Sequence, residues 1–126
     1  MSPVVGLGID VVDVERFAVV MRRRPRLAQR IFTPNELAQC GSNTKRLAAR
    51  FAAREATWKA LGVGVGGVGF RDVSVRTLPS GAPVLELTGT AQRRAQIAGI
   101  TNWHVSLTHT ALTAAAVVVG ENANAS

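Results

Sequence analysis

The chain has 126 residues, and 47% of them are hydrophobic, which suits a single domain with an apolar core. Lysine and arginine outnumber aspartate and glutamate by 15 to 8, so the net charge of +7 favours a polyanionic partner. The one cysteine, Cys40, excludes an intrachain disulfide and a cysteine-based metal site. No apolar run approaches the roughly 18–20 residues of a membrane-spanning helix, so we expect a cytoplasmic protein without membrane insertion.

The first half of the chain predicts one strand followed by helices. Asp13 is placed to cap the first helix, Pro25 ends it, and Gly62 ends the longest helix. The run Thr33-Pro34-Asn35-Glu36 is typical of a capping box with proline at the first helical position. In chain order we expect a buried strand over 3–10 that ends in a carboxylate, a helix over 14–23, a short turn over 26–31, a helix beginning at Pro34, and a long helix over 44–61.

The second half predicts strands with one more helix. The glycine-rich segment 63–69 carries no charge and is expected to be a flexible loop. The expected elements are strands over 73–77 and 84–87 joined by a turn over 78–83, a helix over 89–98, a half-buried strand over 103–108 and a strand over 111–119. The predicted fold class is therefore α+β: a single domain over 1–120, with a mainly antiparallel sheet packed against the long helix, and a disordered tail over 121–126.

Asp10 comes after an apolar run that contains Gly6 and Gly8. A carboxylate at a strand end is a common metal or ligand position, because the sheet holds the side chain rigidly. A structural explanation is also available, since Asp10 could cap the helix that follows.

The long helix carries charged side chains close to its apolar face. At 100° per residue the core-facing stripe consists of Leu47, Phe51, Trp58 and Leu61. Glu55 lies at the edge of this stripe, four residues before Lys59, which is the spacing of an ordinary solvated ion pair. Arg54 points close to the centre of the stripe, so its guanidinium needs a partner at a cleft or an interface, and stacking on Trp58 is one option.

Two further segments carry groups suited to phosphate. The glycine-rich segment lacks the Walker lysine and the Rossmann spacing, yet bare backbone amides can approach a base or a phosphate; a plain loop is the alternative. Near the C-terminus, hydroxyls and an imidazole gather at a strand end, in Ser106, Thr108, His109 and Thr110. A hydroxyl-rich sheet face and a turn histidine would also explain them. His104 alternates outward on its strand and is assigned no role.

Five pieces of sequence form an ordered pattern that covers almost the whole chain. They are Gly8-Ile9-Asp10-Val11-Val12 with Arg16, Thr33-Pro34-Asn35-Glu36-Leu37, Arg50-Phe51-Ala52-Ala53-Arg54-Glu55-Ala56 with Lys59-Ala60-Leu61-Gly62, Gly81-Ala82-Pro83, and Val105-Ser106-Leu107-Thr108-His109-Thr110. This pattern resembles the holo-acyl-carrier-protein synthase family, the small members of the 4′-phosphopantetheinyl transferase superfamily. The resemblance implies the 4′-phosphopantetheinyl transferase fold and a magnesium-dependent transferase activity. Its members move 4′-phosphopantetheine from coenzyme A to a serine of apo acyl carrier protein, releasing adenosine 3′,5′-bisphosphate, in fatty acid biosynthesis and lipid metabolism.

The resemblance also implies roles for individual residues. Asp10 and Glu55 match the Mg²⁺ ligands at the pyrophosphate and act with Lys59 in catalysis; Glu55 or a metal-bound water takes the serine proton. The residues implied in coenzyme A binding are Arg50, Lys59, Gly64, Gly66, Ser106, Thr108, His109 and Thr110. The family commonly has lysine where this chain has Arg54, which keeps the charge but changes the geometry, so the phosphate contact is expected at Lys59.

The arginines of the first quarter are implied in docking the acidic acyl carrier protein. The cluster consists of Arg16, Arg22, Arg23, Arg24, Arg26 and Arg30. The positions that match the family's docking surface are Arg16, Val20, Arg26, Leu27 and Arg30. Arginine suits carboxylates, and long-range attraction raises the association rate. A solubilising basic face would explain the charge but not its concentration here.

Family members of this length are trimers with active sites between protomers. The resemblance therefore implies a homotrimer in which His109 comes from the neighbour of the subunit that supplies Asp10 and Glu55. The sequence is also compatible with two other functions. A nucleic-acid-binding module would explain the net charge of +7, but it leaves the two carboxylates unexplained, so no nucleic-acid partner is expected. An oligomerisation domain without activity is the other.

Overall fold

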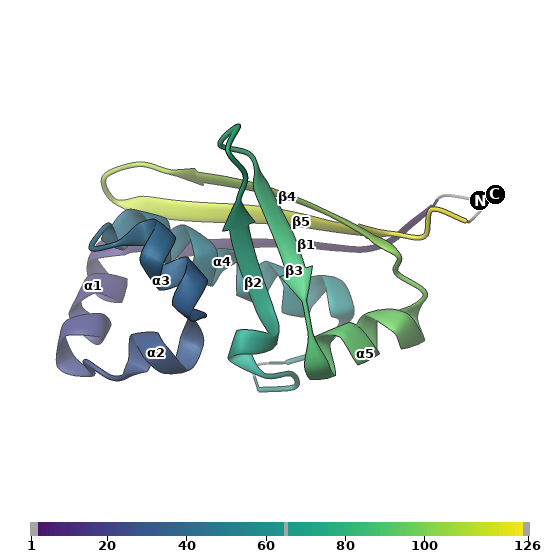
Figure 1. Cartoon of the computed structure of the whole chain (residues 1–126), viewed down its shortest axis with the longest axis horizontal. Coiled ribbons are helices and arrows are strands. Elements are labelled where there is room, and N and C mark those ends of the chain that lie inside the picture. The colour runs from purple at the N-terminus through teal and green to yellow at the C-terminus, as the bar shows by residue number, and fades with distance from the viewer. Residues whose placement is uncertain (1–2, 65, 125–126) are drawn as a thin grey trace.

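The computed structural model describes residues 3–64 and 66–124. An antiparallel three-stranded sheet of order β1-β5-β4, a β2-β3 hairpin and five helices form the described part of the chain (Figure 1). In chain order the elements are β1 (Val4–Asp13), α1 (Val14–Arg23), α2 (Leu27–Ile31), α3 (Pro34–Cys40), α4 (Thr44–Leu61), the 3₁₀ helix η1 (Phe70–Asp72), β2 (Val73–Thr77), β3 (Pro83–Leu87), α5 (Gly89–Ala98), β4 (Asn102–His109) and β5 (Thr113–Glu121). The predicted α+β class, with a mainly antiparallel sheet on a long helix, is confirmed.

The helix boundaries follow the capping residues that the sequence indicated. Asp13 accepts a hydrogen bond from the Arg16 amide at 2.8 Å, so α1 begins at the expected position. Thr33 and Glu36 form both halves of a capping box at the start of α3. Gly62 ends α4 in the left-handed conformation, with φ of 71°. These three predictions are confirmed because each depends on residues that are close together in the chain.

Three boundaries differ from the prediction. β1 continues three residues past Asp10, because residues 11–13 keep pairing with β5; Asp10 therefore lies inside the strand, opposite Ala116. The expected turn over 26–31 is the short helix α2. The expected disordered tail over 121–126 is wrong at its start. Glu121 is the last residue of β5, and the backbone amide of Asn122 donates to the carbonyl of Pro3 at 2.8 Å. Residues 125–126 lie outside the described part of the chain.

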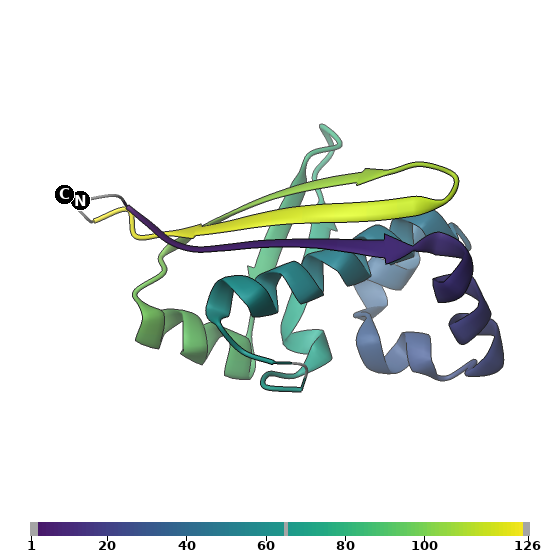
Figure 2. The ribbon, with the colours of Figure 1, turned by 180° about the vertical axis from the view of Figure 1, so that it is seen from behind.

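The buried face of α4 is made of small residues rather than the expected large ones. Of the predicted stripe only Trp58 is buried; Leu47, Phe51 and Leu61 remain partly exposed. The buried hydrophobic positions are otherwise Ala48, Ala49, Ala52, Ala53 and Ala56. The cause lies in β1, where an added Cβ at Gly8 would stand 1.8 Å from the carbonyl oxygen of Ala56. The strand backbone thus touches the helix, and Figure 2 shows α4 lying lengthwise along β1.

The other face of the three-stranded sheet carries exposed apolar residues on β1. Leu7, Ile9 and Val11 alternate with the residues that face α4, and they are 62–63% exposed. Three large hydrophobic side chains in a row on one strand make a face suited to a protein contact. None of the described helices is both long and apolar enough to cross a bilayer.

Candidate active site

Three predicted site residues from distant parts of the chain come together where α4 lies along β1. The Lys59 ammonium is 3.1 Å from Oδ1 of Asp10 and donates to the backbone carbonyl of Ile9 at 2.8 Å. Glu55, one turn earlier on α4, lies against the same aspartate and is hydrogen-bonded to it when protonated. The close contact of Gly8 with α4 is what brings Asp10 to this part of the helix.

The Glu55 carboxyl is held in an environment that favours its protonated form. Burial, the negative charge of Asp10 and the hydrogen bond between the two carboxyls raise the pKa of Glu55 to about 7, and the Lys59 charge only partly opposes this. With both groups ionised, Oδ2 of Asp10 is buried and no donor from the described residues reaches it. Such a pair accepts a proton or a cation.

The residues present fit a magnesium ion. Mg²⁺ prefers carboxylate oxygens, is commonly bound through only one or two of them, and completes its coordination with water and phosphate oxygens. Asp10 offers an unused buried oxygen, and Glu55 offers a carboxylate that is costly to ionise without a counter-charge. Within the described residues no third histidine, cysteine or acid joins them. An ion here would therefore keep several positions open for a ligand.

Glu55 borders a cavity of about 560 Å³ between α1, α2 and α4. Its lining consists of Val11, Val12, Asp13, Arg16, Phe17, Val20, Met21, Leu27, Ile31, Phe51 and Glu55. Three of the predicted docking residues therefore line the same cavity as the Glu55 carboxyl: Arg16, Val20 and Leu27. The remaining two, Arg26 and Arg30, border an adjacent pocket that also includes Leu27. The structure thus brings the predicted docking residues together beside the carboxylate pair.

Arg50 and His109, both predicted to bind coenzyme A, line a separate pocket between α4 and the end of β4. Arg50 is 4% exposed, donates from Nη2 to the Thr77 hydroxyl at 2.6 Å, and has a buried Nε without an acceptor in the described residues. The pocket also contains Arg46 and part of the Gly81-Ala82-Pro83 turn. Two arginines and an imidazole around one pocket suit an anion.

Ser106 and Thr108 lie on the opposite face of the sheet from Asp10. Directly paired residues share a face, and the pairing joins Asp10 through Ala116 to Leu107, whereas Ser106 is joined through Val117 to Ile9. Ser106 and Thr108 therefore stand beside the exposed apolar residues of β1. In one chain they cannot meet the carboxylate pair.

The other predicted coenzyme A residues are also spread out. Gly64 and Gly66 follow the C-terminal end of α4, the end where the Ala60 carbonyl lies against Gly6. His109 is level with Val12, at the far end of β1. Six strand residues separate these two levels, or about 20 Å. The Thr110 hydroxyl accepts hydrogen bonds from the amides of the following turn, at 3.1 and 3.2 Å.

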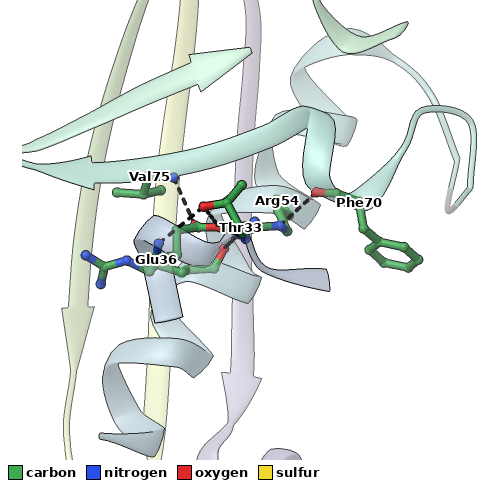
Figure 3. A network of polar contacts seen from close by, with 6 residues as sticks. Thr33, Glu36, Arg54, Phe70 and Val75 are labelled. Atoms are coloured by element: carbon green, nitrogen blue, oxygen red, sulfur yellow. Dashed lines mark hydrogen bonds and ion pairs between the residues drawn. The ribbon is translucent and has the colours of Figure 1, made fainter. Parts of the chain in front are cut away.

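Arg54 does not occupy the place that the sequence suggested. It is fully buried and pairs with Glu36 of α3 (Figure 3). Its guanidinium lies 4.8 Å from the centre of the Phe32 ring rather than on Trp58. The expectation of a cleft or an interface is therefore wrong. Glu36 was identified only as a capping residue, although a carboxylate within an apolar region is itself a signal for a buried cation.

Comparisons with known proteins agree with this arrangement. The family model described as the 4′-phosphopantetheinyl transferase superfamily matches residues 6–115. The holo-[acyl-carrier-protein] synthase of Beutenbergia cavernae is 50% identical over 118 residues, covering 94% of this chain and 98% of that protein.

Solved structures give the same result. The Helicobacter pylori holo-[acyl-carrier-protein] synthase in complex with coenzyme A has a TM-score of 0.82 and 31% identity, over 91% of this chain and 99% of that one. A Bacillus anthracis holo-(acyl-carrier-protein) synthase in complex with coenzyme A (3′,5′-ADP) has a TM-score of 0.79 and 33% identity, over 97% and 100%. The chain therefore belongs to the 4′-phosphopantetheinyl transferase superfamily.

Proposed function

We propose that the protein transfers the 4′-phosphopantetheine group of coenzyme A to a serine hydroxyl of an apo acyl carrier protein and releases adenosine 3′,5′-bisphosphate. The observation that carries this proposal is the cavity in which docking residues Arg16, Val20 and Leu27 adjoin Glu55. A carrier bound there would present its serine beside the carboxylate pair. Two similar structures contain coenzyme A, and the Beutenbergia cavernae relative is named for the carrier. Supply of holo-carrier for fatty acid biosynthesis is part of the proposal.

Asp10 and Glu55 would hold a magnesium ion against the pyrophosphate of coenzyme A. When bound, the ion neutralises charge on the phosphate oxygens. Lys59 contributes a second positive charge; its side chain is 57% exposed, so it can turn from Asp10 toward a phosphate. The serine hydroxyl loses its proton as its oxygen bonds to phosphorus, and Glu55 or a water molecule beside it takes that proton. The leaving group departs as the bisphosphate.

The nucleotide end of coenzyme A would be bound by residues of more than one subunit. Arg50 and His109 provide a pocket for a phosphate, with Thr110 at the adjoining turn. Ser106 and Thr108 lie on the outer sheet face, away from Asp10 of their own chain. Gly64 and Gly66 lie at the other end of α4. A second copy packed on this face brings the separated groups to one ligand.

We further propose that the protein is a homotrimer, because a binding site shared between subunits requires more than one copy of the chain. The apolar residues Leu7, Ile9 and Val11 are exposed in the single chain and would become buried between subunits. His109 would then face Asp10 and Glu55 of the neighbour. A cytoplasmic location is in keeping with Cys40, which is a buried free thiol, as expected in a reducing compartment.

The test is direct transfer. Purified protein is incubated with coenzyme A, Mg²⁺ and an apo acyl carrier protein, and the carrier is weighed by mass spectrometry. The expected result is a gain of one phosphopantetheine mass, which is lost when Mg²⁺ is chelated or Asp10 is replaced by alanine. An unchanged carrier mass would overturn the proposal.

Docking is tested separately by reversing one charge. Arg30→Glu should raise the KM for the carrier and leave the KM for coenzyme A unchanged, because Arg30 borders a docking pocket and does not line the pocket of Arg50 and His109. If the wild type and Arg30→Glu have the same carrier KM across a range of salt concentrations, α2 is not part of the docking surface.

A further inference from the structure

A fully buried ion pair joins α3, the helix that follows α2, to α4, the helix that carries Glu55. Arg54 and Glu36 are both 0% exposed. Nη1 of Arg54 donates to Oε2 of Glu36 at 2.9 Å, and Nη2 donates to Oε1. Nε donates to the backbone carbonyl of Phe70 at 2.9 Å (Figure 3). The guanidinium thus binds three acceptors in α3 and η1 at the same time.

Glu36 also binds the backbone at the α2–α3 junction and in the β2-β3 hairpin. Its Oε1 accepts from the Thr33 amide and its Oε2 from the Val75 amide, each at 3.0 Å. The ring of Phe32, itself 0% exposed, lies 4.8 Å from the Arg54 guanidinium carbon. Phe32 and Thr33 come directly after the last residue of α2. The pair therefore fixes where α2 ends.

α2 depends on such an external anchor. It has five residues and no side-chain cap at its N-terminus, and a helix this short does not hold its shape by its own hydrogen bonds. Yet α2 carries Leu27 and Arg30, which line the pockets assigned above to the carrier. The position of these side chains relative to Glu55 consequently depends on the contacts at Phe32 and Thr33.

We propose that Arg54 is a positioning residue for the carrier protein: by holding Glu36 and the Phe70 carbonyl together with Phe32, it sets the distance between the docking helix α2 and Glu55, the next residue of α4. This inference rests on the proposed function. It predicts different effects on the two substrates, because Arg54 has no hydrogen bond to the side chains of Asp10, Lys59 or Arg50 among the described residues. Its one bond to these residues runs from Nη1 to the backbone carbonyl of Arg50 at 3.3 Å, within α4.

The pair is not explained by stability alone. A buried ion pair contributes little more than well-packed apolar residues of the same volume, whereas removing one partner leaves an uncompensated charge. The informative change therefore neutralises both residues, as Glu36→Gln with Arg54→Met. The glutamine keeps an acceptor near Thr33 and Val75, and the Phe70 carbonyl loses its donor. Arg54→Lys keeps the charge but cannot reach all three acceptors.

The experiment measures steady-state transfer with each substrate varied in turn. For the double variant, folded by circular dichroism at the assay temperature, we expect the carrier KM to rise about tenfold, the loss expected of a displaced docking contact. The KM for coenzyme A and kcat at saturating carrier should stay within about twofold. Arg54→Lys should give a smaller rise in carrier KM. The matched control is Arg76→Met with Glu86→Met, which removes an exposed pair on the adjoining hairpin and should leave every parameter unchanged.

An unchanged carrier KM in the folded double variant would overturn the inference. So would a rise in the coenzyme A KM, or a fall in kcat, as large as the change in carrier KM. Should the double variant fail to fold, Arg54→Lys decides by the same criteria. If wild-type protein shows no transfer, the proposed function has failed. If transfer occurs but Arg30→Glu leaves the carrier KM unchanged, α2 is not part of the docking surface and this inference fails with it. If Arg30→Glu raises the carrier KM and the Arg54 variants do not, only this inference has failed.

Discussion

At the scale of single residues, Glu55 is partly buried and lies close to Asp10, so its own ionisation costs free energy. The pKa of Glu55 is raised to about 7, chiefly by burial and secondly by Asp10. Neither cause is available from the sequence, where Glu55 and Lys59 have the spacing of an ordinary helical ion pair. In the structure Lys59 bonds to Asp10 instead, and Glu55 depends on a proton or a cation for compensation.

Magnesium binding should therefore depend on pH. Below pH 7 the ion must displace the proton of Glu55, so its affinity should fall about tenfold for each pH unit. Above pH 7 the carboxylate is already ionised and the affinity should level off. Calorimetry at pH 6, 7 and 8, in two buffers of different ionisation enthalpy, reports both the affinity and the released proton. The same affinity at pH 6 and 8 would contradict the assignment of Glu55 as a ligand.

The raised pKa also predicts that Glu55 destabilises the metal-free fold. Its pKa goes from 4.5 in the unfolded chain to about 7 in the folded one. The folded state therefore binds more protons between these values, and its free energy of unfolding falls as pH rises from 4.5 to 7. Glu55→Gln lacks this loss, so it should melt at a higher temperature than the wild type at pH 8 without metal. The two melting temperatures should converge near pH 4. A variant that is less stable at pH 8 would exclude this explanation.

At the scale of elements, the backbone contact between β1 and α4 determines the site. Gly8 meets the Ala56 carbonyl and Gly6 meets the Ala60 carbonyl, so strand and helix approach more closely than side chains would allow. This proximity is what lets Lys59 reach both Asp10 and the Ile9 carbonyl. The glycines before Asp10 are thus structural requirements of the proposed metal-binding pair.

Gly8→Ala should accordingly disrupt both stability and activity. The added Cβ would stand 1.8 Å from the backbone oxygen of Ala56, which cannot move without displacing α4. We expect a loss of about 3 kcal/mol in the free energy of unfolding, with transfer reduced in whatever fraction stays folded. Gly120→Ala is the matched control. Its Cβ would meet side-chain atoms of Ile100 and Trp103 at 2.9–3.1 Å, so about 1 kcal/mol is expected. Equal losses from urea denaturation of the two variants would refute the argument.

Sequence reasoning succeeded where the cause is local and failed where it is long-range. Asp13, Thr33 and Gly62 cap or end their helices through neighbours within a few residues, and all three boundaries were predicted. The apolar stripe of α4 was misplaced, because helical periodicity cannot show that β1 approaches as bare backbone. Arg54 was recognised as unusual, but its partner Glu36 lies 18 positions away, on a helix whose packing no local pattern reveals.

At the scale of the whole molecule, one chain carries the residues proposed for the site on opposite faces of its three-stranded sheet. Asp10 and Glu55 lie on the α4 side of the sheet, whereas Ser106 and Thr108 lie on the outer side with Leu7 and the other exposed residues of β1. The family resemblance gave an assembly of several copies as an expectation. Strand pairing gives a physical reason for it, since alternate residues of a strand point to opposite faces.

Charging the outer sheet face should separate the subunits. Leu7 is 63% exposed in the single chain, so Leu7→Glu should fold normally but run as a monomer in light scattering after size exclusion, with transfer lost. Ile97→Glu is the matched control, since Ile97 is 77% exposed on α5, away from the sheet. A Leu7→Glu protein that keeps both its trimer and its activity would place the subunit contact elsewhere.

Mixing two inactive variants tests whether one site draws on two subunits. Glu55→Gln and His109→Ala should each abolish or strongly reduce transfer when every subunit carries the change. In trimers formed from equal amounts of both, about a quarter of the interfaces join an intact Glu55 to an intact His109 of the neighbour, from random cyclic assembly. Activity should therefore recover to about a quarter of the wild-type value after the two proteins are unfolded and refolded together, and not when they are mixed folded. If both residues served the site from the same chain, no arrangement of the two variants would contain a complete site, and the co-refolded mixture would remain inactive.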